Sequence, residues 1–229
     1  MSASRIELDI HSLYDGFNAP IASFDCGKKC APHNPGGKPF CCDICHAVPA
    51  AYHQEWAYLQ PRTELWHTWR GDECVQDPED PAKLQAETSD HMLLLACLGP
   101  DKCQRPYRAL SCRQFPFFPY VSSGLRFLGL AYEWAFEENC WVISNLQVVS
   151  DAYRQQFIRV FDHLFERWPE EFNSYIALSE EMREHFAGLR RRIPLLHRNG
   201  KSYLLSPLSE RLYRVPVERL PQFGPYRVE

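Results

Sequence analysis

The sequence predicts an α+β fold, namely a helix-rich single domain with two irregular cysteine-rich segments and a C-terminal β-hairpin. Three observations lead to this prediction. Apolar residues recur at helical spacing in two late segments, Asn199-Gly200 separates two apolar runs, and segments 26–46 and 97–120 are rich in cysteine and proline. Segment 26–46 has few apolar residues, so something besides a hydrophobic core must hold it.

Two helices are predicted late in the chain. The first has Asp151 as its N-cap candidate and carries apolar residues at three- and four-residue steps, which are Tyr153, Phe157, Phe161, Leu164 and Trp168. Pro169 is predicted to begin the second, because proline is favoured in the first helical turn. Its buried face is expected to consist of Phe172, Ile176, Met182, Phe186 and Leu189.

Shorter elements are predicted elsewhere. Residues 47–59 suit a helix with Pro49 in its first turn, and the acidic segment 71–90 suits a loop that leads into a short helix. Segments 125–134 and 140–146 are apolar enough to form strands. Asn199-Gly200 favours the positive dihedral angles of a type I′ turn, which predicts a β-hairpin around it.

The chain has 229 residues, which is enough for one sizeable core. We expect an N-terminal lead-in (1–23), a cysteine-cluster metal-binding region (24–120) and an α+β region (121–229) packed on it in one compact domain. The net charge is −7 over residues 1–100 (7 basic, 14 acidic) and +3 over residues 101–229 (18 basic, 15 acidic). Neither value predicts a nucleic-acid partner.

No run approaches the 18 apolar residues that a membrane span needs, and the N-terminus lacks the apolar stretch of a secretory signal. The sequence therefore predicts a cytoplasmic protein without a membrane partner. In a reducing compartment, clustered cysteines are more often metal ligands or catalytic groups than disulfides. The ten cysteines are consequently the first feature that points to chemistry.

Eight of the cysteines fall into two groups, and we predict that these groups meet to bind metal. The candidate ligands are Cys26, Cys30, Cys41, Cys42, Cys45, Cys97, Cys103 and Cys112. Cys97 ends an apolar run and could equally be a buried thiol, whereas Cys74 and Cys140 are expected outside the site. His46 directly follows Cys45 and could coordinate, or it could be an ordinary surface residue.

A set of soft thiolates suits an iron–sulfur cluster, or a zinc or iron ion, and does not suit magnesium or calcium. Lys28, Lys29 and Arg113 are expected to add positive charge that favours thiolates. The adjacent side chains of Cys41 and Cys42 are expected to diverge, so either one packs away or the pair serves two metal atoms. This pair and the excess of thiols favour iron, as a cluster, over zinc.

Two neighbours of the last ligand are expected to shape the site. Arg113 could hydrogen-bond a thiolate or a carbonyl, or form a surface salt bridge. The phenylalanines that follow are expected to wall the site and exclude water, and these are Phe115, Phe117 and Phe118.

The segment Cys112-Arg113-Gln114-Phe115-Pro116, together with the early cysteines, resembles the YkgJ-type cysteine-cluster family, described as zinc- or iron-chelating domains. The early part of the resemblance rests on Phe24, Cys26, Cys30, Cys41 and Cys42. Here three residues instead of two separate the first thiols, about ten residues are inserted before Cys41-Cys42, and Cys45 is extra. The resemblance covers roughly residues 24–118 and implies metal binding.

Three functional hypotheses follow. The first is a metal-binding protein whose partner is the metal ion. The second is a metal-dependent enzyme for group transfer or redox chemistry on a protein substrate, which needs an open coordination position. The third is a scaffold with a structural metal and a protein partner that binds the 125–229 region. The sequence contains no phosphate-binding loop, dinucleotide fingerprint or nucleophile elbow.

Overall fold

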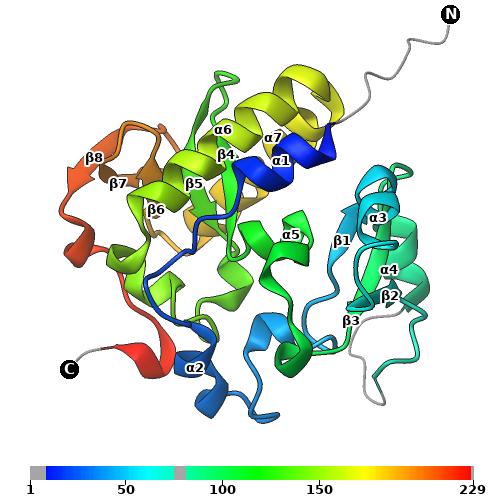
Figure 1. Cartoon of the computed structure of the whole chain (residues 1–229). Coiled ribbons are helices and arrows are strands. Elements are labelled where there is room, and N and C mark those ends of the chain that lie inside the picture. Colours follow the sequence, from blue (N-terminus) through cyan, green and yellow to red (C-terminus); the bar gives the residue numbers. More distant parts are fainter. Residues whose placement is uncertain (1–8, 75–80, 228–229) are drawn as a thin grey trace, which may run out of the picture. The chain divides into compact units, whose positions relative to one another are not determined.

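The structure is a computed structural model that describes residues 9–74 and 81–227. It has the predicted α+β class and divides into two compact units (Figure 1). Within the described chain, unit 1 contains residues 15–24 and 116–227, and unit 2 contains residues 9–14 and 25–115. None of the described helices is both long enough and apolar enough to span a membrane.

Unit 1 is built on a five-stranded antiparallel sheet in the order β4-β5-β6-β7-β8. Its strands are β4 (Phe117–Val121), β5 (Phe127–Tyr132), β6 (Ile193–His197), β7 (Ser202–Leu205) and β8 (Leu212–Val215). The predicted hairpin is confirmed, because β6 pairs with β7 around Asn199-Gly200 and Gly200 has φ +83°. The predicted strand over 125–134 is β5.

Two long helices, α6 (Asp151–Arg167) and α7 (Pro169–Gly188), contact each other and the strands β5 and β4 (Figure 1). The α6 prediction was one residue late at its start, since the N-cap is Ser150, whose hydroxyl accepts the N–H of Tyr153 at 3.2 Å. The start of α7 at Pro169 is confirmed. Leu189 was wrongly placed on its buried face, because that residue lies beyond the helix end and is exposed.

Two of the three phenylalanines that were expected to wall the site belong to a strand of unit 1. Phe117 and Phe118 are fully buried in β4, where their rings contact Tyr153 and Trp134. They are therefore core residues of the unit 1 sheet. Alternating burial did not reveal this strand, because all of its residues are buried.

The strand predicted over 140–146 is wrong. Residues Ile143–Val148 form a 3-10 helix, and the N–H of Cys140 bonds the carbonyl of Phe136 at 2.8 Å. The apolar residues Val142, Ile143 and Leu146 are still buried. A short apolar run cannot by itself distinguish a strand from a buried helical turn, and here local hydrogen bonds decided the outcome.

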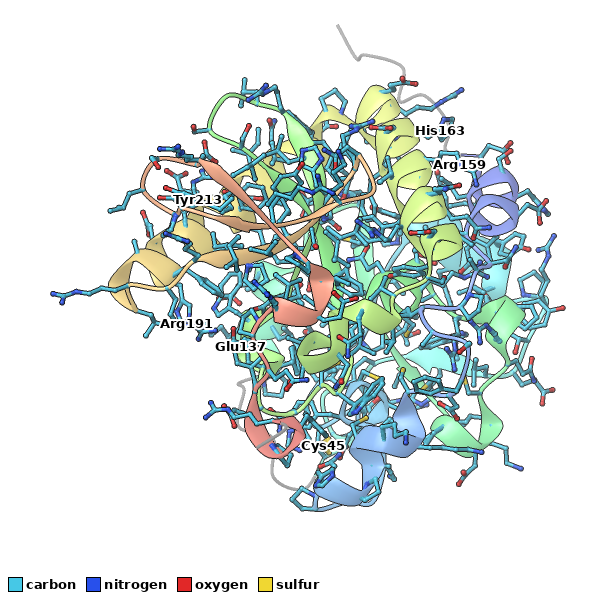
Figure 2. The ribbon with its side chains drawn as sticks, turned by 90° about the vertical axis from the view of Figure 1, so that its left-hand side faces the viewer. Cys45, Glu137, Arg159, His163, Arg191 and Tyr213 are labelled. Carbon is cyan, nitrogen blue, oxygen red and sulfur yellow. A yellow bond between two sulfur atoms is a disulfide. The ribbon has the colours of Figure 1, made fainter. Side chains whose placement is uncertain are left out.

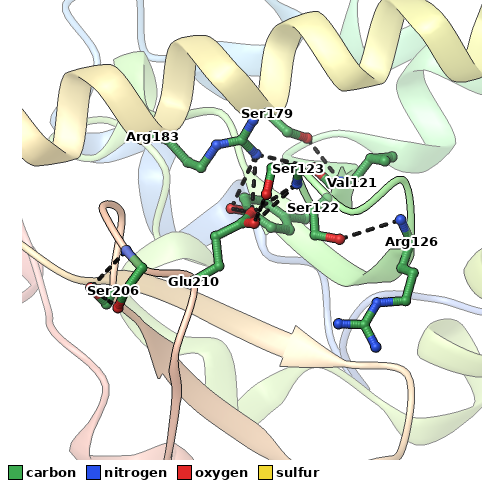
Figure 3. A network of polar contacts seen from close by, with 10 residues as sticks. Val121, Ser122, Ser123, Arg126, Ser179, Arg183, Ser206 and Glu210 are labelled. Carbon is green, nitrogen blue, oxygen red and sulfur yellow. Dashed lines mark hydrogen bonds and ion pairs between the residues drawn. The ribbon is translucent and has the colours of Figure 1, made fainter.

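Two partly buried ion pairs stabilise the loops of unit 1. Glu210, on the β7–β8 turn, accepts hydrogen bonds from Arg183, Tyr120 and both the backbone and the hydroxyl of Ser123 (Figure 3). The carboxylate of Glu137 accepts a hydrogen bond from each of the two terminal nitrogens of Arg191, both at 2.8 Å (Figure 2). Both arrangements connect segments distant in sequence and account for these residues structurally.

Unit 2 has a smaller antiparallel sheet of three strands in the order β1-β3-β2. They are β1 (Ala50–Tyr52), β2 (Trp66–Thr68) and β3 (Met92–Cys97). Its helices are α2 (Gly27–Cys30), α3 (His53–Leu59), α4 (Pro81–Glu87) and α5 (Leu110–Gln114), and α1 (Ile10–Gly16) precedes them. The expected short helix after the acidic loop is α4, while residues 75–80 of that loop lie outside the described chain.

The helix predicted over 47–59 is only half correct. Ala50–Tyr52 pairs with β3, and the helix begins afterwards at His53. The reason lies at Tyr52, whose extended backbone caps α3 and whose N–H is accepted by Glu55 at 3.3 Å. Pairing with the central strand thus overrides the helical spacing of the first residues.

Candidate metal centre

Unit 2 brings six thiols from both cysteine-rich segments into one neighbourhood, which we call the thiol cluster. Its members are Cys26, Cys30, Cys42, Cys97, Cys103 and Cys112, all free of disulfides. Short elements position them. Cys26 and Cys30 lie at the two ends of α2, Cys97 ends β3, and Cys112 lies on α5. Each of the two cysteine-rich segments, 26–46 and 97–120, therefore supplies three of the six thiols.

Cys42 occupies the centre of the thiol cluster. Its sulfur interacts electrostatically with Cys30 of the first segment and with Cys97 and Cys112 of the second. Cys103 in turn interacts with Cys97 and Cys112. These pairs are therefore close enough for one sulfur to influence the ionisation of the other, which places the two segments near each other within unit 2.

Arg108 is the cation of the thiol cluster. Its Nε–H donates a hydrogen bond to the Cys103 sulfur at 3.0 Å. Its guanidinium also interacts with Cys26, Cys42 and Cys112. This charge was expected from Lys28, Lys29 and Arg113; both lysines are exposed, and Arg113 donates to backbone carbonyls. Arg108 was missed because it lies five residues after one cysteine and four before the next, with no motif to mark it.

Arg113 fixes the backbone that carries Arg108. Its guanidinium donates to the carbonyls of Pro106 (2.6 Å), Arg108 (3.0 Å) and Tyr14 (2.9 Å). The indole N–H of Trp66 donates to the carbonyl of Tyr107, which lies between Pro106 and Arg108, at 2.7 Å. Three successive carbonyls are therefore held in place. Of the alternatives open for Arg113, the structure shows hydrogen bonds to carbonyls.

Glu55 orients the helix that carries Cys112. This carboxylate is 0% exposed and accepts the N–H of Leu110, the first residue of α5, at 2.6 Å. It also accepts the Tyr14 hydroxyl at 2.7 Å. Burial raises the pKa of Glu55, while these hydrogen bonds oppose the rise. An acidic residue at the start of α5 fits the positive end of a helix.

The thiols differ in their tendency to ionise. Burial raises the pKa of Cys26 to about 11 and also raises the pKa of Cys30, Cys97 and Cys112. Cys42 is the exception. A hydrogen bond from the Cys41 thiol lowers its pKa to about 7, with help from Arg108 and against burial. Cys42 is thus more readily converted to a thiolate than Cys26, Cys30, Cys97 or Cys112.

The vicinal pair does not diverge as expected. The sulfurs of Cys41 and Cys42 lie 4.0 Å apart. Two thiolates on one tetrahedral zinc ion would be about 3.8 Å apart, given zinc–sulfur bonds of about 2.3 Å. The 3-10 turn Phe40–Cys42 thus brings adjacent sulfurs to a spacing that one metal ion could accept. The pair therefore no longer argues for two metal atoms.

Cys45 does not belong to the thiol cluster, which corrects its prediction as a ligand. Its sulfur forms a disulfide bond with Cys74, a residue that was expected outside the site (Figure 2, where Cys45 is labelled). The bridge connects the loop after Cys42 to the loop before the undescribed residues 75–80. The ring of His46 stacks on Phe40 at 4.4 Å. Cys140 lies in unit 1.

The described parts of the chain, 9–74 and 81–227, contain no group of three or more His, Cys, Asp or Glu side chains already arranged to hold a metal ion. The thiols nevertheless form a soft donor set with an adjacent cation, and this composition fits a thiolate-bound metal. Comparison with known proteins adds no assignment, because no family model, curated protein or solved structure matches the chain.

Proposed function

We propose that the protein binds metal through the thiol cluster, as an iron–sulfur cluster or as a zinc or iron ion. The convergence of cysteines from two distant segments around Cys42 carries this proposal. A hydrophobic core does not require such a gathering, and disulfides do not use these sulfurs. Soft metal ions and iron–sulfur clusters are the partners that several thiolates suit best.

Metal binding would draw the thiols together and release their protons. The thiols that burial keeps protonated must lose those protons to coordinate, so binding energy is coupled to both pH and folding. Six thiols exceed the four that one tetrahedral ion uses, which supports an iron–sulfur cluster or more than one ion. Cys41 is not one of these six, but its sulfur lies close enough to that of Cys42 for a single ion to bind both, which supports a single ion instead. The proposal retains both forms.

Membership of the YkgJ-type family belongs to the proposal and rests on the motif around Cys112-Arg113 together with the early cysteines. A cytoplasmic location belongs to it as well. The disulfide bond to Cys74 occupies the sulfur of Cys45, so Cys45 is not among the proposed ligands.

The test uses Co²⁺ as a spectroscopic probe of thiolate coordination. Protein reduced under anaerobic conditions is titrated with Co²⁺, and Zn²⁺ is then added to displace it. We expect sulfur-to-cobalt charge-transfer bands in the wild type, and their loss or strong reduction in Cys42→Ser and Cys112→Ser. Cys140→Ser is the matched control because Cys140 lies in unit 1. Equal bands in all variants would overturn the proposal.

A further inference from the structure

Arg108 has a position that the metal-binding proposal does not by itself explain. A partly buried guanidinium lies among four thiols, donates to Cys103 at 3.0 Å, and interacts with Cys26, Cys42 and Cys112. The ion pairs of unit 1 each join an arginine to a carboxylate. Arg108 instead faces sulfurs, which are weak partners for a cation unless they become thiolates.

The backbone of Arg108 is held with unusual completeness. Arg113 donates hydrogen bonds to the carbonyls on either side of Tyr107, and the indole N–H of Trp66 donates to the carbonyl of Tyr107 itself. The N–H of Arg108 also bonds the carbonyl of Arg105 at 3.3 Å, which closes the turn. A long side chain emerging from a fixed backbone loses less freedom when it makes a defined contact. The fixed backbone thus positions the guanidinium of Arg108 against the thiol cluster.

The charge balance of the cluster gives Arg108 its role. A centre with four or more thiolates carries net negative charge around a zinc ion or an iron–sulfur cluster. The carboxylate of Asp25 interacts with Cys26, Cys30 and Cys42 and disfavours their ionisation. Lys28 and Lys29 extend into solvent. Arg108 is therefore the cation that the described structure places against several of these sulfurs at once.

We propose that Arg108 is a positioning residue of the metal centre, which orients Cys103 by a hydrogen bond and offsets the negative charge of the thiolates. This inference rests on the proposed function. Hydrogen bonds from groups outside the ligand set commonly contribute about 10- to 100-fold to metal affinity. The role requires a positively charged hydrogen-bond donor at this position. Lysine should therefore substitute for arginine in part, and glutamine, which is neutral, should not.

The experiment compares Arg108→Gln and Arg108→Lys with the control Arg105→Gln, an exposed arginine on the same turn. Co²⁺ affinity is measured by competition with a chelator, and the pH at which half of the Co²⁺ is released is recorded. Arg108→Gln should bind about 10- to 100-fold more weakly and release Co²⁺ at higher pH. Arg108→Lys should restore part of both values, and Arg105→Gln should match the wild type.

The outcomes separate the two proposals. Wild-type affinity in Arg108→Gln, together with lost binding in Cys112→Ser, would overturn the role of Arg108 and leave metal binding intact. Failure of the wild type to bind Co²⁺ would overturn both. If Arg108→Gln does not fold by circular dichroism, Arg108→Lys decides, because it loses the Nε hydrogen bond while keeping the charge. Its affinity must then fall, and an unchanged affinity would refute the positioning role.

Discussion

The carboxylate of Glu55 accepts the backbone N–H of Leu110 at 2.6 Å and so connects the first turn of α3 to the first residue of α5. Cys112 lies two residues further along α5. One buried acidic residue therefore links the small sheet of unit 2 to a member of the thiol cluster. This relationship makes Glu55 a support for the site, because it fixes the start of the helix that carries Cys112.

Glu55→Ala should destabilise the protein by about 3 kcal/mol or more, because it removes hydrogen bonds to Leu110, Tyr52 and Tyr14 and leaves buried donors without acceptors. Denaturant unfolding measures the change. Glu64→Ala, at an exposed position, is the control and should remain within about 0.5 kcal/mol of the wild type. Equal stabilities for the two variants would show that the network around Glu55 is not a support.

Gly129→Ala should destabilise unit 1 by more than about 2 kcal/mol. Gly129 has φ +150°, and a Cβ there would lie 2.3 Å from the carbonyl oxygen of Leu196 on the neighbouring strand. Gly188→Ala is the opposite case, since a Cβ at the end of α7 meets nothing within 4 Å. It should be neutral or stabilise by up to about 1 kcal/mol. Thermal unfolding of both variants distinguishes strain from a general intolerance of substitution.

Cys74→Ser should lower the stability of the oxidised protein and leave the reduced protein unchanged. The bridge to Cys45 spans 29 residues of sequence, for which the chain-entropy estimate is about 3 to 4 kcal/mol. Unfolding is measured with and without a reductant, in metal-free protein. Cys140→Ser should show the same stability change under both conditions. A reductant-independent effect of Cys74→Ser would mean that the bridge does not form.

Glu133 should make the folded protein less stable as the pH rises from about 4.5 to 7. Burial raises the pKa of Glu133 to about 7, whereas its value in an unfolded chain is near 4.5. Between these values the folded state binds more protons, so the free energy of unfolding falls with rising pH, by roughly 3 kcal/mol at most. Glu133→Gln should flatten this dependence, and an unchanged pH profile in the variant would contradict the assignment.

The sequence allowed prediction of elements whose causes are local. The helix at Pro169 and the hairpin at Asn199-Gly200 follow from proline and glycine geometry, and both are present. Residues 47–59 and 140–146 were misjudged because pairing with β3, and hydrogen bonds of a 3-10 turn, outweighed spacing. These competing interactions involve partners that periodicity cannot identify.

The candidate site divides in the same way. The spacing of the cysteines identified the members of the thiol cluster, because a cysteine can be recognised as a thiol donor from the sequence alone. Cys45 was assigned wrongly, since its partner Cys74 lies across a loop and sequence spacing does not give disulfide pairing. Arg108 and Glu55 were missed, because their roles arise only when the turn at 105–108 and α5 are placed in three dimensions.

Metal analysis of natively purified protein tests the central claim most directly. The chain is purified anaerobically with a reductant, and its zinc, iron and acid-labile sulfide are quantified alongside the visible spectrum. The account predicts stoichiometric zinc, or iron with sulfide and a brown colour, and its loss in Cys112→Ser. Protein that is folded, colourless and free of both metals, and that takes up neither zinc nor iron with sulfide on reconstitution, would contradict it.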